Sequence, residues 1–203
     1  MNAVSIADRY IDTLAALLRA TEVTNNTRSV MPLDEGIGWM RNAARETHRR
    51  GNKIMFVGNG GSAGIASHLA IDYSKNGSLR AVAFNDAVAL TCLSNDLGYD
   101  RVFSEQIALH ARSGDLLVAI SSSGASANIL NAVKAARAAG VSIVTLSGFS
   151  PENPLRRTGD VNFYVRSNAY GFVEVAHLAL CHAVLDIELG WQAGDAAAAK
   201  IAV

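Results

Sequence analysis

Residues 114–148 read GDLLVAISSSGASANILNAVKAARAAGVSIVTLSG, and this stretch decides the fold class. Residues 115–120 (DLLVAI) and 141–146 (VSIVTL) are short apolar runs with the length of buried strands, and an alanine-rich helix is predicted between them over 126–139. Two strands that are apolar throughout, joined by a helix, are typical of a parallel sheet covered on both faces.

The same alternation of strand and helix continues on both sides of this unit. Strands are predicted over 53–57, 81–84 and 161–165, and helices over 2–24, 32–50, 63–75, 87–95, 101–111 and 170–190. The sequence therefore predicts a single α/β domain over 1–203, with a doubly wound five-stranded parallel sheet flanked by helices. Residues 1–50 are expected to form an N-terminal helical hairpin and residues 51–192 the α/β core, with a helical or frayed alanine-rich tail after them.

Composition argues against several classes of partner. Lys and Arg together number 18, as do Asp and Glu, so the net charge is zero and a nucleic acid is not an expected partner. No apolar run approaches the ~20 residues of a membrane span, so no membrane partner is expected. Cys92 and Cys181 lie in apolar stretches, and we expect buried free thiols and a cytoplasmic protein.

A glycine-rich loop follows the first strand of the core. Residues 58–62 (GNGGS) precede a helix, where glycines let backbone amides turn toward an anion, and the candidate ligand-binding residues are Asn59, Gly60, Gly61 and Ser62. A tight strand–helix turn is one alternative. A dinucleotide site is another, because GNGGSA fits G-x-G-x-x-A and Asp86 could bind a ribose.

A serine-rich loop follows the strand 115–120. Ser121, Ser122, Ser123 and Ser126 precede the next helix, and their hydroxyls can enclose a phosphate dianion without Lys or Arg. A helix N-cap would need only Ser126. A dinucleotide site does not need this second loop, so the two loops together favour a phosphorylated small molecule and no nucleotide cofactor.

Histidines and carboxylates recur at helical spacing. His68 and Asp72 are four residues apart and share one helix face. Glu174 and His182 are eight apart, about 80° around the last helix, and His177 competes with His182 because it is three residues from Glu174. Two histidines and two carboxylates suit zinc or a similar divalent ion, although His68 could also be an ordinary, partly buried histidine.

Four stretches together resemble the SIS (sugar isomerase) domain family, and within it the phosphoheptose isomerases. They are VGNGGSAGIASHLA (57–70), LSNDLGYDRVFSEQI (93–107), the stretch 114–148 and VEVAHLALCHAVLD (173–186). The resemblance implies isomerisation of sedoheptulose 7-phosphate to a heptose 7-phosphate through an enediol. It also implies a homotetramer with active sites between subunits, in agreement with apolar residues such as Ile6, Tyr10, Trp39 and Met40 in the N-terminal helices.

The resemblance also implies roles for individual residues. Ser121, Ser123 and Ser126 would hold the phosphate, Asn59 and Ser62 would touch the sugar, and Asn95 and Asp96 would lie near its hydroxyls. His182 would be the catalytic histidine, and His68 would bind zinc in those members that hold it.

Two departures from the family pattern bear on the chemistry. Asp72 stands where the family has Glu, and Glu174 stands where it has Gln. We expect Asp72, Glu174 and His182 to share the proton transfers, and His68, Asp72, Glu174 and His182 to bind the metal. The alternatives are an isomerase of another sugar phosphate, a non-catalytic adapter of the kind that associates with a replication initiator, and a sugar-phosphate sensor; the retained Asp72 and His182 favour an enzyme.

Overall fold

A seven-stranded sheet with the order β2-β1-β7-β6-β5-β3-β4 runs through this computed structural model, which describes residues 5–192. The strands are β1 (Glu22–Asn25), β2 (Val30–Met31), β3 (Ile54–Gly58), β4 (Ala81–Ala83), β5 (Leu116–Ser121), β6 (Ser142–Ser147) and β7 (Val161–Tyr164). The α-helices are α1 (Ile6–Arg19), α2 (Leu33–Arg49), α3 (Gly61–Lys75), α4 (Ala87–Leu97), α5 (Val102–His110), α6 (Ala127–Ala138) and α7 (Tyr170–Glu188). Two short 3₁₀ helices, η1 (Tyr99–Arg101) and η2 (Pro154–Arg157), complete the described elements.

The five predicted strands form the parallel part of the sheet. Strands β4, β3, β5, β6 and β7 pair in parallel, and the apolar runs of the sequence lie in them. Alternate residues of each strand face opposite sides, so Leu116 and Val118 join one core cluster while Leu117 and Ala119 join the other. The α/β class and the parallel core follow the sequence prediction.

The N-terminal region differs from the prediction. The helix predicted over 2–24 ends at Arg19, and β1 follows it, paired antiparallel with β7 and with β2. Val23 and Thr24 are β-branched and buried in this edge of the sheet, which favours a strand over a helix. The sheet therefore has seven strands instead of five, and a β-hairpin separates α1 from α2 where a helical hairpin was predicted.

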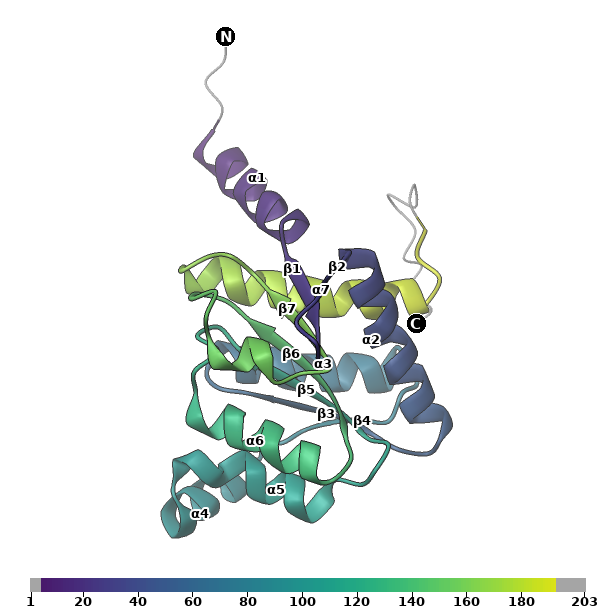
Figure 1. Cartoon of the computed structure of the whole chain (residues 1–203), viewed down its shortest axis with the longest axis vertical. Coiled ribbons are helices and arrows are strands. Elements are labelled where there is room, and N and C mark those ends of the chain that lie inside the picture. The colour runs from purple at the N-terminus through teal and green to yellow at the C-terminus, as the bar shows by residue number, and fades with distance from the viewer. Residues whose placement is uncertain (1–4, 193–203) are drawn as a thin grey trace.

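Two helical layers cover the sheet (Figure 1). Helices α2, α3 and α7 pack on one face, and α5 and α6 cover the other with α4 at its margin. Helix α1 projects away from the body and packs against α7. The carboxyl ends of β3 and β5 lie at the edge where α3 and α6 begin, and this edge carries both loops singled out in the sequence.

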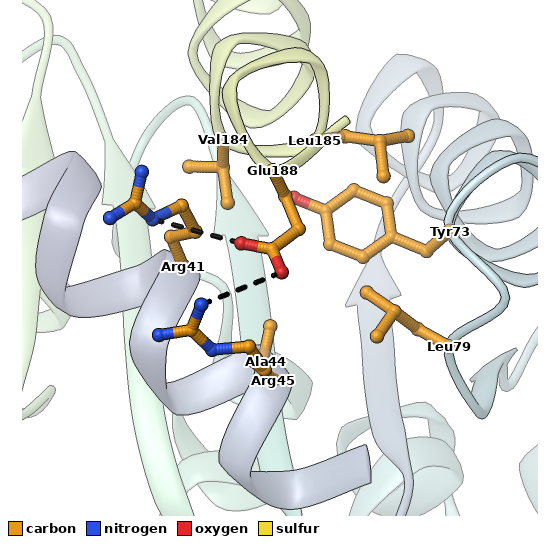
Figure 2. A pocket seen from close by; sticks show the side chains of 8 residues that line it. All are labelled: Arg41, Ala44, Arg45, Tyr73, Leu79, Val184, Leu185 and Glu188. Carbon is orange, nitrogen blue, oxygen red and sulfur yellow. Dashed lines mark ion pairs between the residues drawn. The ribbon is translucent and has the colours of Figure 1, made fainter. Parts of the chain in front are cut away.

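Helix α7 is tied to α2 at its far end. Glu188 faces Arg41 Nε at 3.7 Å and Arg45 Nη1 at 3.8 Å (Figure 2). These residues and Tyr73 border a cavity of about 10 Å³, the size of about one water molecule. The ion pairs join α7 to α2, and the cavity beside them is too small for a ligand.

By length and composition, α7 is long and apolar enough to cross a membrane, which the sequence analysis did not expect. Its buried residues, among them Val173, Leu180 and Val184, belong to the core cluster on one face of the sheet. The core helix of a folded domain meets the same criteria, so this finding is weak evidence for a membrane span.

Three smaller expectations meet different outcomes. Both cysteines are free, but only Cys181 is buried, where burial raises its pKa to about 12. Cys92 is exposed, because α4 has no buried residue. Met40, expected on an exposed apolar face, is 1% exposed in the core. The alanine-rich tail from residue 193 lies outside the described residues.

Candidate active site

Both predicted loops open into one cavity of about 260 Å³. The residues of the two loops that line it are Asn59, Gly60, Gly61, Ser62, Ser121, Ser122, Ser123 and Ser126. Helix α7 adds Tyr170 and Glu174 to the lining. A ligand site at the carboxyl ends of parallel strands is the arrangement expected of an open α/β sheet.

The glycine-rich loop brings the backbone close to this cavity. Gly60 has a φ of +55°, a conformation that disfavours side chains, and a Cβ at Gly58 would lie 2.5 Å from the carbonyl oxygen of Ser62. A Cβ at Gly61 would collide with the carboxylate of Glu174. The glycines therefore bring β3, α3 and α7 close together at the cavity.

Asn59 is fixed by its neighbours. Its Nδ2 donates to Asn128 Oδ1, and its Oδ1 accepts from Asn128 Nδ2 and from Tyr99 Oη, each at 2.9 Å. Asn59 was predicted to touch the sugar, whereas neither Asn128 nor Tyr99 was predicted to be its partner. Asn128 follows the serine loop by two residues, so Asn59 joins the two loops as well as lining the cavity.

The serine hydroxyls gather around Ser121. Its Oγ lies 3.4 Å from the Oγ atoms of Ser123 and Ser126 and accepts from the Gly124 amide at 3.1 Å. Ser126 stands at the N-cap of α6, yet its side chain makes no capping hydrogen bond. Its hydroxyl is therefore not consumed by the helix, unlike in the N-cap interpretation.

Most of the residues that line this cavity are serines and glycines. No Lys, Arg or His lines it among residues 5–192, and its one carboxylate belongs to Glu174. Helices α3 and α6 begin at Gly61 and Ala127, so their N-termini, which favour negative charge, meet at the two loops. This lining can accept a phosphate without a basic side chain.

A second cluster joins α3 to α7. His68 Nε2 lies 3.2 Å from His182 Nε2 and 3.2 Å from Asp72 Oδ2, and His182 Nε2 lies 3.6 Å from the same carboxylate oxygen. Such close donors on two helices could hold a metal ion. Two imidazoles and one carboxylate are a zinc donor set with an open position.

Glu174 is not part of this cluster, contrary to the four-ligand expectation. The three donor atoms that lie within 4.8 Å of one another belong to His68, Asp72 and His182. Glu174 contacts Gly61 in the cavity instead. Eight residues span about 12 Å along a helix, and this rise separates two side chains whose angular positions alone would let them meet.

Three more sequence candidates do not line the cavity. Asn95 and Asp96 are exposed on α4 and bond to one another, Asn95 Nδ2 to Asp96 Oδ1 at 2.8 Å, and neither lines the cavity. Asp86, the candidate ribose ligand, caps α4 by accepting from the Ala89 amide at 2.9 Å.

His177, the competitor of His182, is fully buried. Its Nε2 donates to the carbonyl of Ser147 at 3.0 Å, and burial lowers its pKa to about 4 despite this hydrogen bond. The structure thus gives His177 a packing role and leaves His182 beside Asp72.

Tyr170 is the lining residue that the sequence analysis missed. It precedes Glu174 by one helical turn, a spacing that places both on one face of α7. Because Glu174 was predicted to bind a metal with His68, Asp72 and His182, its neighbour Tyr170 was not predicted to line the cavity.

The fold and the cavity define an α/β domain with a candidate ligand site at the carboxyl ends of its parallel strands, and comparisons with known proteins narrow this class. The family model described as "SIS domain" matches residues 9–148. A phosphoheptose isomerase from Aliarcobacter butzleri is 39% identical over 150 residues, 71% of this chain and 79% of that protein. One from Rhodospirillum rubrum is 39% identical over 140 residues, 66% of this chain and 74% of that protein.

Solved structures agree with the sequence matches. The phosphoheptose isomerase GmhA from Neisseria gonorrhoeae has a TM-score of 0.73 and 32% identity, over 91% of this chain and 99% of that one. A phosphoheptose isomerase from Francisella tularensis has a TM-score of 0.76 at 24% identity, over 90% and 95% of the chains, which supports the fold. This chain belongs to the SIS domain family, and within it to the phosphoheptose isomerases.

Proposed function

We propose that this protein interconverts sedoheptulose 7-phosphate and a heptose 7-phosphate. The observation that carries the proposal is that five serines and Glu174 line one cavity. The hydroxyls, the loop amides and two helix N-termini would bind the phosphate. The carboxylate lies within the same cavity, where a bound sugar would extend.

Isomerisation moves one proton between two carbons. A base removes a proton from C1 of the ketose, the C–H electron pair forms the C1=C2 bond, and the carbonyl oxygen O2 takes a proton to give the enediol. The O1 hydroxyl then loses its proton to form the aldehyde, and the C1=C2 electron pair takes a proton at C2. We assign the transfer of the proton between C1 and C2 to Glu174, because Glu174 lines the cavity. In the metal-free protein, Asp72 and His182, whose Oδ2 and Nε2 atoms lie 3.6 Å apart outside the lining, would move the oxygen-bound protons.

His68, Asp72 and His182 would hold a divalent metal, with zinc the best match to their donors. When bound, such an ion would polarise the sugar oxygens. Metal analysis of protein purified without chelator tests this assignment. We expect about one equivalent per chain, lost in His68→Ala and retained in Glu174→Gln; loss in Glu174→Gln would restore the four-ligand set.

We further propose a homotetramer in the cytoplasm. Helices α1 and α4 have no buried residue. Their apolar side chains are therefore exposed: Ile6 is 83% exposed, Ile11 62% and Val88 75%. Such apolar faces usually contact another subunit, and closed symmetry is the common result. Light scattering at micromolar concentration tests the tetramer, and a monomer would contradict it.

A coupled assay across C5, C6 and C7 ketose phosphates tests the function. We expect the highest kcat/KM with sedoheptulose 7-phosphate and no competition by the unphosphorylated sugar. A preference for a shorter ketose phosphate would favour another isomerase of this class. Tight binding without turnover of any ketose phosphate would favour an adapter or a sensor.

A further inference from the structure

We infer that Tyr170 forms a stacking subsite for the carbon chain of the bound sugar and thereby selects sugar phosphates over phosphate itself. This inference rests on the proposed function, because it assumes that the cavity takes a phosphorylated sugar. It adds a specificity-determining residue that the phosphate-binding loops do not supply.

The first observation is the position of the ring. Tyr170 and Glu174 are one turn apart on α7, and both line the cavity together with the serine loop. Tyr170 is 61% exposed, so the core does not use most of its surface. The cavity wall on this side therefore combines an aromatic ring with a carboxylate.

The second observation is a residue that restrains this ring. Phe149 meets Tyr170 edge to face, with ring centroids 4.8 Å apart and planes at 78°. Phe149 has a φ of +55°, a backbone conformation that side chains of this size rarely adopt. Such a conformation persists only where the surroundings impose it.

Two hydrogen bonds hold the backbone of Phe149 in this positive-φ conformation. Its amide donates to the carbonyl of Ser167 at 3.0 Å, and its carbonyl accepts from Tyr164 Oη at 2.8 Å. Two anchored hydrogen bonds thus hold Phe149 in a strained conformation beside the cavity. The result is a restrained orientation of the Tyr170 ring.

The chemistry of this wall matches a polyhydroxylated chain. An aromatic ring offers a large apolar surface to C–H groups at small entropic cost, and a carboxylate accepts hydrogen bonds from hydroxyls. Inorganic phosphate at the serine hydroxyls has no carbon chain to pack against Tyr170, whereas a phosphorylated sugar has one. Truncation of the ring should therefore weaken binding of the sugar phosphate and leave binding of phosphate unchanged.

Steady-state kinetics on Tyr170→Ala and Tyr170→Phe separate these two ligands. We expect Tyr170→Ala to raise KM for sedoheptulose 7-phosphate about 10-fold, the scale of one lost aromatic contact, with the inhibition constant of inorganic phosphate within about twofold. Tyr170→Phe keeps the ring and should stay within about threefold of the wild type in KM. Trp191→Ala removes an exposed aromatic residue beyond the other end of α7 and serves as the matched control.

Two outcomes overturn the inference. An unchanged KM in Tyr170→Ala removes the contact with the sugar, and an equal weakening of phosphate inhibition shows a general disturbance of the cavity. Calorimetric titration with the sugar phosphate and with phosphate gives the same comparison without turnover. If the wild type binds but does not isomerise, the proposed function fails, and the ratio of the two dissociation constants still decides the role of Tyr170.

Discussion

Glu174 places a carboxylate in a cavity that is otherwise lined by Ser, Gly, Asn and Tyr residues. A phosphate dianion and a carboxylate repel one another in a site with no basic side chain among its described lining residues. The carboxylate is therefore expected to weaken phosphate binding, and a role in proton transfer would explain its presence. Asp72 is at the cluster with His68 and His182 and does not have this conflict.

Glu174→Gln separates these two effects. We expect inorganic phosphate to inhibit more tightly because the repulsion is removed, while kcat falls ~100-fold or more because a general base is lost. Asp72→Asn is the matched control, since it removes a carboxylate outside the cavity and should leave the inhibition by phosphate unchanged. A near-wild-type kcat in Glu174→Gln would return the base role to Asp72.

At the scale of elements, the serine loop depends on one backbone conformation. Gly124 has a φ of +61°, and a Cβ there would collide with the side chain of Asn153. Asn153 cannot easily move, because it is 3% exposed and its Nδ2 donates to the carbonyls of Gly148 and Ser150. The loop that presents the serines is thus held in place by its neighbour after β6.

Gly124→Ala should displace the serines. We expect at least a ~10-fold weaker inhibition by phosphate and a stability loss of about 1–3 kcal/mol from the strained backbone. Gly64→Ala is the control, because Gly64 lies in α3 with nothing within 4 Å of an added Cβ and should gain up to about 1 kcal/mol. Thermal unfolding measures the stability of the two variants, and steady-state kinetics measures their inhibition by phosphate. Equal stability and equal inhibition constants in Gly124→Ala and Gly64→Ala would contradict this role of Gly124.

At the scale of the whole molecule, α7 connects the layers that build the site. His177 bonds to the carbonyl of Ser147 at the end of β6, and Val173 packs where Gly148 leaves no room for a Cβ. The Gly148 amide in turn donates to the carbonyl of Ser122 at 3.0 Å. The packing of α7 on the sheet and the position of the serine loop therefore depend on the same residues, Ser147 and Gly148.

Burial of His177 makes the stability of the fold depend on pH. Its pKa is lowered from 6.5 to about 4, so between these values the unfolded chain binds a proton that the folded chain does not. Stability from this group is present above about pH 6.5 and is lost as the pH falls toward about 4, by roughly 3 kcal/mol in total.

Urea unfolding between pH 4 and pH 7 measures this loss. His177→Gln cannot titrate but keeps a donor for the Ser147 carbonyl, and it should be less stable at pH 7 with a shallower pH dependence. An equally steep pH dependence in His177→Gln would assign the effect to other groups.

The sequence by itself determined the features that depend on local order. Apolar runs such as 115–120 gave the parallel strands, since a strand buried on both faces has no polar alternation to obscure it. The two loops follow their strands directly, so topology brought them to one edge of the sheet. His68 and Asp72 share one turn of α3, and their proximity follows from helix geometry.

Only the tertiary structure decided which partners meet. Strand β1 forms because β7 offers an edge to Val23 and Thr24, a pairing across about 140 residues that no local pattern reports. The rise of α7 sends Glu174 to the cavity and His182 to the cluster, although both lie on one helix. Tyr170 lines the cavity, and Phe149, which is hydrogen-bonded to Tyr164 and Ser167, lies against its ring. These placements depend on long-range packing, which local propensity and spacing do not contain.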